Sequence, residues 1–117
     1  MKTWITQLRK GVLEFCVLNI LSHEETYGYE IMQRLKELAE MAITESTVYP
    51  ILSRLKAEGY LKVRAAASLD GPPRRYFSLT ESGRIRLKQM NEYWDALNGC
   101  IGVLKSGEQI HEVSNRN

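Results

Sequence analysis

Apolar positions near the start of the chain recur at the spacing of an α-helix. Residues 8–21 are the predicted first helix, and one stripe along it consists of Leu8, Val12, Phe15 and Leu18. Other apolar residues spread around the same segment, so little of its surface is polar. A helix of this kind is usually covered on two sides. We therefore expect one side to face the domain core and the other, with Leu8, Val12 and Phe15, to face a second copy of the chain.

A polar stretch at residues 22–26 interrupts this pattern and precedes a second amphipathic segment. Thr26 is expected to be the N-cap of a helix from about residue 27 to residue 40, since a threonine hydroxyl can accept a bond from a free N–H of the first turn. The inward positions of this helix are Ile31, Leu35 and Leu38. Residues 42–44 then form a turn.

A third helix is predicted to be capped by Thr44 or Ser46 and to stop at Gly59. Its inward face consists of Val48, Ile51, Leu52 and Leu55, and its outward face carries Ser46, Thr47, Tyr49, Ser53 and Arg54. Pro50 has no backbone N–H, so it belongs within or just past the first turn.

The next segment has the pattern of two strands. Residues 60–67 are the first predicted strand and residues 76–79 the second, joined by the loop SLDGPPRR at residues 68–75. Asp-Gly is a turn signal, and the two prolines stiffen the loop. Helix, turn, helix and hairpin in this order predict a winged helix-turn-helix, a mostly α fold with a small β-hairpin.

The last predicted helix is capped by Thr80 and extends to about residue 104. Its apolar positions alternate in steps of three and four, as in a coiled coil, and they are Leu87, Met90, Trp94, Leu97, Ile101 and Leu104. We expect the first five of these to form a dimerisation seam. The chain is then one winged-helix domain at residues 1–105, with a DNA-binding part (1–79), a dimerisation helix (80–105) and a polar tail (106–117).

Composition adds a charge asymmetry to this picture. The net charge of the 117 residues is only +2, but residues 44–76 contain six basic and three acidic residues. Such a local excess can attract a polyanion to one face. Two cysteines and two histidines, without ligand spacing, indicate neither a disulfide scaffold nor a metal site. No apolar run is long enough to span a bilayer, and we expect a cytoplasmic protein without a cofactor.

Candidate chemistry lies on the third helix and in the basic loop. The outward residues of the third helix are expected to contact duplex DNA, because a recognition helix presents hydroxyls and guanidinium groups to phosphates and base edges. Arg74 or Arg75 would contact the backbone or minor groove from the wing. The alternatives are an ordinary solvated helix face and a turn whose charges serve solubility.

Trp94 has a second possible role. By default it is core or subunit interface, but an indole at a two-fold interface can also line a pocket for a planar aromatic ligand. Cys16 and Cys100 are interpreted as packed side chains rather than redox sensors.

Three segments together resemble the PadR family of bacterial transcriptional regulators, in its shorter subfamily. They are LRKGVLEFCVLNILSHEETYGYEI (8–31), STVYPILSRLKAEGYL (46–61) and DGPPRRYFSLTESG (70–83). The resemblance implies a winged helix, a C-terminal helix that dimerises on the partner's first helix, and repression at inverted-repeat operators. It also implies that some members respond to phenolic acids or planar drugs, with an aromatic near the position of Trp94. The chain departs from the family pattern at residues 65–67, which are all alanine.

Two other function classes are weighed against a DNA-binding repressor. A winged-helix module that binds proteins would more naturally carry acidic or apolar residues in place of Tyr49, Arg54 and Arg75. An enzyme is not indicated, because no nucleophile is grouped with a base.

Overall fold

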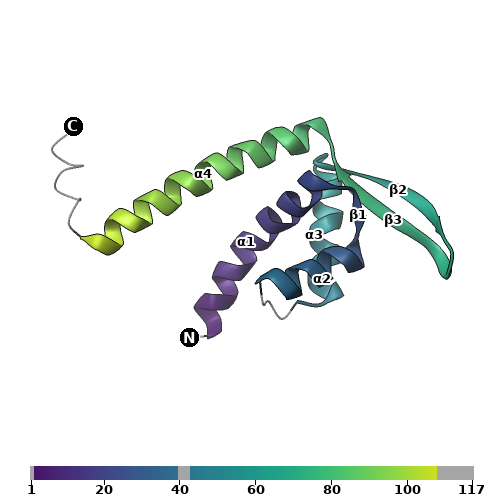
Figure 1. The fold of residues 1–117 in the computed structure, drawn as a ribbon, viewed down its shortest axis with the longest axis horizontal. Coiled ribbons are helices and arrows are strands. Elements are labelled where there is room, and N and C mark those ends of the chain that lie inside the picture. The colour runs from purple at the N-terminus through teal and green to yellow at the C-terminus, as the bar shows by residue number, and fades with distance from the viewer. Residues whose placement is uncertain (1, 40–42, 108–117) are drawn as a thin grey trace. The chain divides into compact units, whose positions relative to one another are not determined.

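The computed structural model describes residues 2–39 and 43–107, and the side chains of residues 4–37 and 43–107. The elements are α1 (Lys2–His23), β1 (Thr26–Tyr27), α2 (Gly28–Ala39), α3 (Glu45–Ala57), β2 (Leu61–Ser68), β3 (Gly71–Leu79) and α4 (Glu81–Ser106) (Figure 1). The chain forms two compact units, Met1–Leu87 and Lys88–Asn117, and α4 begins in the first and continues into the second. We call the first the winged-helix unit and the second the C-terminal unit.

The mostly helical winged fold is confirmed, and its core lies between three helices and a sheet. The fully buried side chains come from all of these helices, and they include Val17, Leu18 and Leu21 of α1, Ile31 of α2, and Val48, Leu52 and Leu55 of α3. The predicted inward face of α3 is therefore confirmed, with Ile51 half-buried. The side chain of Leu38, predicted to face inward in α2, lies outside the described residues.

α1 is longer than predicted. It begins at Lys2 rather than at residue 8, and its first turns present Trp4, Ile5 and Leu8 to solvent in the single chain. Val12 and Phe15 are half-buried. The sequence carried a sign of this extra length that the prediction missed, because Trp4 and Ile5 lie four and three residues before Leu8 and continue the helical spacing of the stripe.

Thr26 is not the N-cap of α2, contrary to the prediction. It lies in the short strand β1, where Thr26 is opposite Phe77 and Tyr27 is opposite Tyr76, and α2 begins at Gly28. The sheet therefore has three antiparallel strands in the order β1-β3-β2. Pairing with β3 satisfies backbone N–H and C=O groups of these two residues, which would otherwise bond to water. The sequence gave no sign of this strand, because two residues are too few to show an alternating pattern.

The end of α3 follows the prediction closely. Gly59 has a φ of +85°, a left-handed conformation that glycine adopts without steric cost. The N–H of Tyr60 donates to the carbonyl of Leu55 at 2.9 Å, and the N–H of Gly59 donates to that of Lys56 at 3.0 Å. This pair of bonds is the Schellman motif, which closes a helix and redirects the chain. At the other end Thr44 occupies the N-cap position, but its side chain makes no capping bond.

The prediction of a loop at residues 68–75 is wrong. β2 and β3 are joined by only the two residues Leu69 and Asp70, so the basic Gly-Pro-Pro-Arg-Arg segment is part of β3. A register shift between Ala66 and Ser68 lies opposite the two prolines. Prolines offer no N–H to a ladder, and a bulge accommodates the missing bonds. The missing N–H groups of the two prolines, which suggested a loop in the sequence, are accommodated in the structure by the bulge.

α4 is capped as predicted. The Thr80 hydroxyl accepts a bond from the N–H of Gly83 at 3.0 Å, which satisfies one of the free donors of the first turn. The same hydroxyl donates to the carbonyl of Gly59 at 2.7 Å, and the Ser82 hydroxyl donates to that carbonyl at 2.9 Å. The end of α3 and the start of α4 are thereby joined at one backbone oxygen. We call this junction the Gly59 joint.

The seam predicted on α4 divides between the two units. Leu87 is buried in the winged-helix unit, whereas the apolar residues farther along the helix are exposed in the single chain, and these are Trp94, Leu97, Ile101 and Leu104. Met90 is half-buried. The predicted polar tail lies outside the described residues from residue 108 onward. In the part of the chain that is described, no helix is long and apolar enough to cross a membrane.

Candidate nucleic-acid interface

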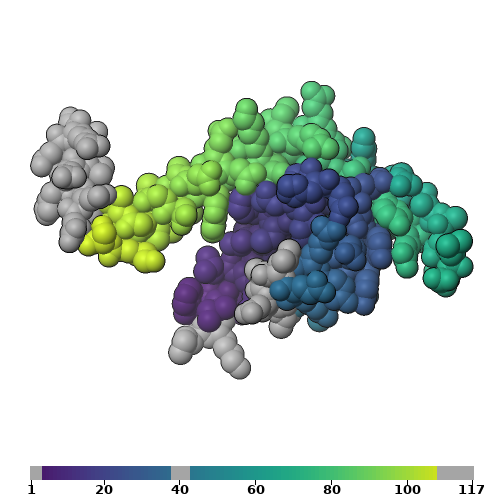
Figure 2. All heavy atoms as spheres, in the orientation of Figure 1, coloured from purple at the N-terminus to yellow at the C-terminus, as the bar shows by residue number. Residues whose placement is uncertain are grey.

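A hollow of about 440 Å³ lies between α3 and the wing, within the winged-helix unit. Residues from four places line it: Tyr49, Ser53 and Lys56 on α3, Ser68 and Asp70 at the tip of the hairpin, residues 71–75 (with Arg74 and Arg75) and Phe77 on β3, and Tyr27, Gly28 and Tyr29 at the junction of β1 and α2. The wing, in teal and green, extends beyond the helices (Figure 2). We call this hollow the helix–wing groove.

The α3 side of the groove has polar and aromatic groups at helical spacing. Tyr49, Ser53 and Lys56 follow one another at intervals of four and three residues, so they lie on one face of the helix. Lys56 was not among the residues predicted to bind DNA. The same spacing from Tyr49 would have identified it in the sequence.

Ser46 and Thr47 lie in the first turn of α3 and are exposed. The Ser46 hydroxyl is 2.6 Å from the hydroxyl of Thr44, and neither Ser46 nor Thr47 lines the groove. Both remain predictions as DNA contacts, at the end of the helix that usually lies nearest the base edges.

Arg54 has carboxylate partners within the chain. Its guanidinium is 2.6 Å from Glu14 of α1 and 3.0 Å from Glu58. The pKa of Arg54 is raised above its ordinary value, chiefly by the hydrogen bond to Glu14 and to a smaller extent by the bond to Glu58. A guanidinium engaged in this way connects α3 to α1, which favours a structural role over the predicted contact with DNA.

The wing side of the groove carries two arginines without carboxylate partners. Within the described ranges, neither Arg74 nor Arg75 forms an ion pair, and the same is true of Lys56. The cross-strand neighbours of the two arginines are Ala66 and Ala65, whose methyl groups are too short to cover a guanidinium. The alanines that depart from the family pattern therefore leave both arginines exposed.

Arg74 is held by an aromatic ring rather than by an acid. Its guanidinium carbon is 4.5 Å from the centroid of the Tyr27 ring, within the range of a cation–π interaction. The Tyr27 ring in turn meets the ring of Tyr76 edge-on, with centroids 5.5 Å apart. This stacking uses the face of the guanidinium and leaves its N–H groups, which lie in the guanidinium plane, available to an acceptor.

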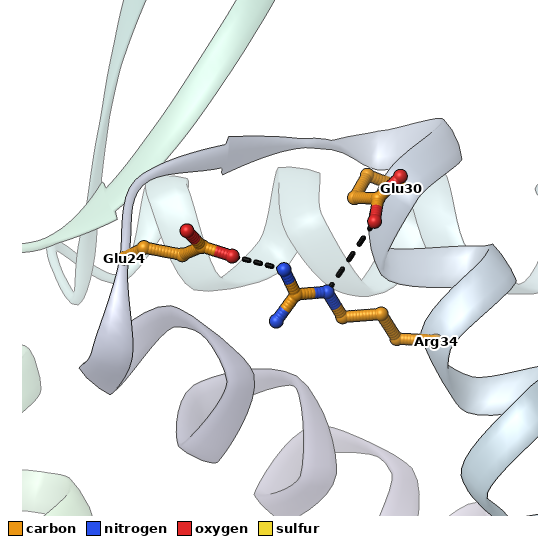
Figure 3. A network of polar contacts seen from close by, with 3 residues as sticks. All are labelled: Glu24, Glu30 and Arg34. Atoms are coloured by element: carbon orange, nitrogen blue, oxygen red, sulfur yellow. Dashed lines mark hydrogen bonds and ion pairs between the residues drawn. The ribbon is translucent and has the colours of Figure 1, made fainter.

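Two consecutive glutamates fix the segment that leads into β1. Glu25 accepts three hydrogen bonds from Arg64 of β2, at 2.6 to 2.9 Å, and this hydrogen bonding is the main cause that lowers the pKa of Glu25. Glu24 pairs with Arg34 of α2, which also reaches Glu30 at 3.4 Å (Figure 3). The junction of β1 and α2 is thus braced to the sheet on one side and to α2 on the other.

The remaining predicted sites lie away from the groove. Trp94 is 42% exposed in the C-terminal unit, and its role in binding a planar ligand stays a prediction. Cys16 is half-buried, and burial raises the pKa of its thiol, in keeping with a packed side chain. Cys100 is exposed rather than packed, contrary to our interpretation of the sequence. No group of three potential metal ligands occurs among the residues described.

Comparison with known proteins gives a consistent family match. The model of the family described as "Transcriptional regulator PadR-like family" matches residues 17–89. The structure of a PadR-like transcriptional regulator from Bacillus cereus is 35% identical, with a TM-score of 0.79 over 87% of this chain and 99% of that one. A transcriptional regulator from Streptococcus is 39% identical, with a TM-score of 0.77 over 85% of this chain and 97% of that one.

A third relative is the Negative transcriptional regulator PadR of Bacillus subtilis, which is 31% identical over 78 residues. The match covers 65% of this chain and 43% of that protein, so it spans less than half of the relative's length. The structure of Bacillus subtilis PadR in complex with operator DNA is similar to this chain with a TM-score of 0.63 and 30% identity, over 68% of this chain and 46% of that one.

Proposed function

The chain belongs to the PadR-like family of transcriptional regulators, and on that premise we propose that it is a homodimeric repressor that binds an inverted-repeat operator through the helix–wing groove. Membership in a family of regulators agrees with the expectation that the chain is not an enzyme. A repressor that binds chromosomal DNA would act in the cytoplasm.

The observation that carries the proposal is the group of unpaired cations in the helix–wing groove. Lys56 lies on the α3 side, and Arg74 and Arg75 lie on the wing side. A duplex placed against both elements would set its phosphates beside all three, while Tyr49 and Ser53 offer hydroxyls between them. Arginine and lysine are the side chains that most often bind phosphate oxygens, and such contacts fix a protein's register on the duplex. The Bacillus subtilis relative supports this assignment, because its structure was determined with operator DNA.

Repression by a dimer is the finer part of the proposal. The name of the Bacillus subtilis relative describes a negative regulator. In the single chain, Leu8 of α1 and Leu97 and Ile101 of α4 are exposed apolar residues, and burial in a dimer would remove them from water. Two α3 helices related by a two-fold axis would contact half-sites about one helical turn apart. We propose residues 1–79 as the DNA-binding part and residues 80–105 as the dimerisation helix.

Selection of DNA tests the proposal directly. Purified protein would be incubated with a random pool of duplexes, and the retained fragments would be sequenced after several rounds. We expect a motif with two-fold symmetry and half-sites about 10 base pairs apart. Retention of no sequence above the background, at any salt concentration, would contradict the proposal and favour a winged-helix module that binds other proteins.

The last part of the proposal is a planar aromatic effector that binds at Trp94. Trp94 is half-exposed between the apolar residues of α4, and in a two-fold dimer two such indoles can approach one axis. A ligand stacked there would change DNA affinity only by the ratio of its affinities for the two dimer states. Fluorescence titration with phenolic and polycyclic compounds would compare wild type with Trp94→Phe and Trp4→Phe. Absence of quenching specific to Trp94 would exclude this ligand class.

A further inference from the structure

We infer that Gly28 is a positioning residue for Tyr49: its missing side chain makes the space in which the Tyr49 ring lies against the junction of β1 and α2, with the hydroxyl held at the helix–wing groove. The inference rests on the proposed DNA-binding function, because Tyr49 is one of the residues expected to contact the duplex. It adds a residue to the site that does not itself have to touch DNA.

The contact is specific to the outer end of the ring. A Cβ atom added to Gly28 would lie 2.5 Å from Cε1 of Tyr49, 2.8 Å from Cζ and 2.9 Å from the hydroxyl oxygen. These separations are well below ordinary van der Waals contact. The phenol end of Tyr49 therefore lies close against Gly28, and a methyl group there would have to displace it by about 1 Å to restore ordinary van der Waals contact.

The surroundings of Gly28 cannot easily move to make room. β1 and the two residues before it are anchored, since Tyr27 pairs with Tyr76 in the sheet and Glu24 and Glu25 pair with Arg34 and Arg64. Gly28 itself is buried. The flexible partner in the contact is the end of the Tyr49 side chain, so the ring should move and the backbone should stay.

Gly28 also has no conformational reason to be glycine. The left-handed backbone conformation that favours glycine occurs, within the described residues, at Gly59 and Gly107. Gly28 begins a helix, where alanine is the better helix former. The substitution Gly28→Ala should therefore leave the fold intact while it moves the Tyr49 ring, which separates positioning from stability.

A double-mutant cycle in DNA binding tests the inference. The probe is a duplex of about three helical turns carrying the motif selected by the wild-type protein. Tyr49→Ala should weaken binding roughly tenfold or more, the usual scale for one lost bond to a charged group. Gly28→Ala should reproduce most of that loss. In the Tyr49→Ala background, Gly28→Ala should have no further effect, because the added methyl then meets no ring.

Two controls accompany the cycle. Gly11→Ala adds a methyl group to α1 at a position with no atom within 4 Å, and it should leave DNA affinity unchanged. The thermal unfolding midpoint of Gly28→Ala should equal or exceed that of wild type. Nuclear Overhauser effects between Hα of residue 28 and the Tyr49 ring protons, strong in wild type and weaker in Gly28→Ala, would report the ring displacement without DNA.

The outcomes are distinct. Equal affinity of wild type and Gly28→Ala would overturn the inference and leave the proposed function standing. An equal loss of DNA affinity on adding Gly28→Ala to wild type and to Tyr49→Ala would also overturn the inference, because it would mean that residue 28 acts on DNA directly. A Gly28→Ala protein that does not fold would overturn it as well. A wild-type protein that binds no selected duplex would instead remove the proposed function, and the inference with it.

Discussion

The salt dependence of DNA binding follows quantitatively from the cations of the helix–wing groove. Each chain contributes Lys56, Arg74 and Arg75, so a dimer would release counterions from about six phosphates. The slope of log K against log salt concentration is then roughly −5, at about −0.9 per neutralised phosphate. Raising the salt from about 50 to about 200 mM should lower affinity roughly a thousandfold.

Single substitutions should change this slope in a way that distinguishes free cations from paired ones. Arg75→Ala or Lys56→Ala removes two phosphate contacts per dimer, which should make the slope shallower by about 2. Arg54→Gln is the matched control, because the guanidinium of Arg54 already pairs with Glu14 and Glu58. It should leave the slope unchanged.

Fluorescence anisotropy of a labelled duplex, measured at four or more salt concentrations, gives each slope directly. Two results would refute the reasoning. One is a wild-type slope near zero, which would mean that the groove does not face phosphates. The other is an equal change for Arg54→Gln and Arg75→Ala, which would mean that intramolecular ion pairs do not decide which cations meet DNA.

Three further predictions concern stability, assembly and pH. Gly83→Ala should destabilise the protein by about 1–3 kcal/mol, because the added methyl would lie 2.2 Å from a backbone carbonyl oxygen. Gly99→Ala, whose added methyl would have nothing within 4 Å, should raise the free energy of unfolding by up to about 1 kcal/mol. Urea unfolding at one protein concentration compares the two variants. Leu97→Lys should shift the dimer toward monomer by placing a charge in the apolar seam, and light scattering that finds wild type monomeric at micromolar concentration would contradict this. Arg64→Gln should return the pKa of Glu25 upward to its ordinary range, as followed by NMR titration. The lowered pKa in wild type means that the stabilisation from this pair is full above the ordinary pKa and is lost as the pH falls through the lowered value.

The sequence predicted the elements whose signals are local and repeated. Four helices with apolar faces, the glycine stop at Gly59 and the cap at Thr80 all follow from spacing or from one residue type in one position, and the structure confirms them. β1 could not be predicted in this way. A strand of two residues has no period, and it forms only because β3 offers it an edge.

The candidate site was predictable as a region and less so by residue. The sequence indicated the outward face of α3 and the basic part of the wing; of these, Tyr49 and Ser53 on α3 and both wing arginines line the groove. The partners of individual charges depend on tertiary packing. Arg54 and Lys56 are two residues apart on one helix and both are cationic, yet one reaches Glu14 of α1 and the other lines the groove. The spacing from Tyr49 already places Lys56 on the groove face, whereas the pairing of Arg54 with Glu14 can be seen only in the fold.

The Gly59 joint has a consequence for how a signal would travel through the chain. The carbonyl oxygen of Gly59, just beyond the end of α3, accepts bonds from the hydroxyls of Thr80 and Ser82 at the start of α4. Gly83 lies so close to the carbonyl of Tyr60 that the two backbones have no room to slide. A rotation of the first turn of α4 must therefore carry the end of α3 with it, without passing through the wing. Such coupling is reciprocal. Binding of an operator to α3 would therefore shift the equilibrium between positions of α4, and a change in the position of α4 would alter the affinity for that operator by the same free energy.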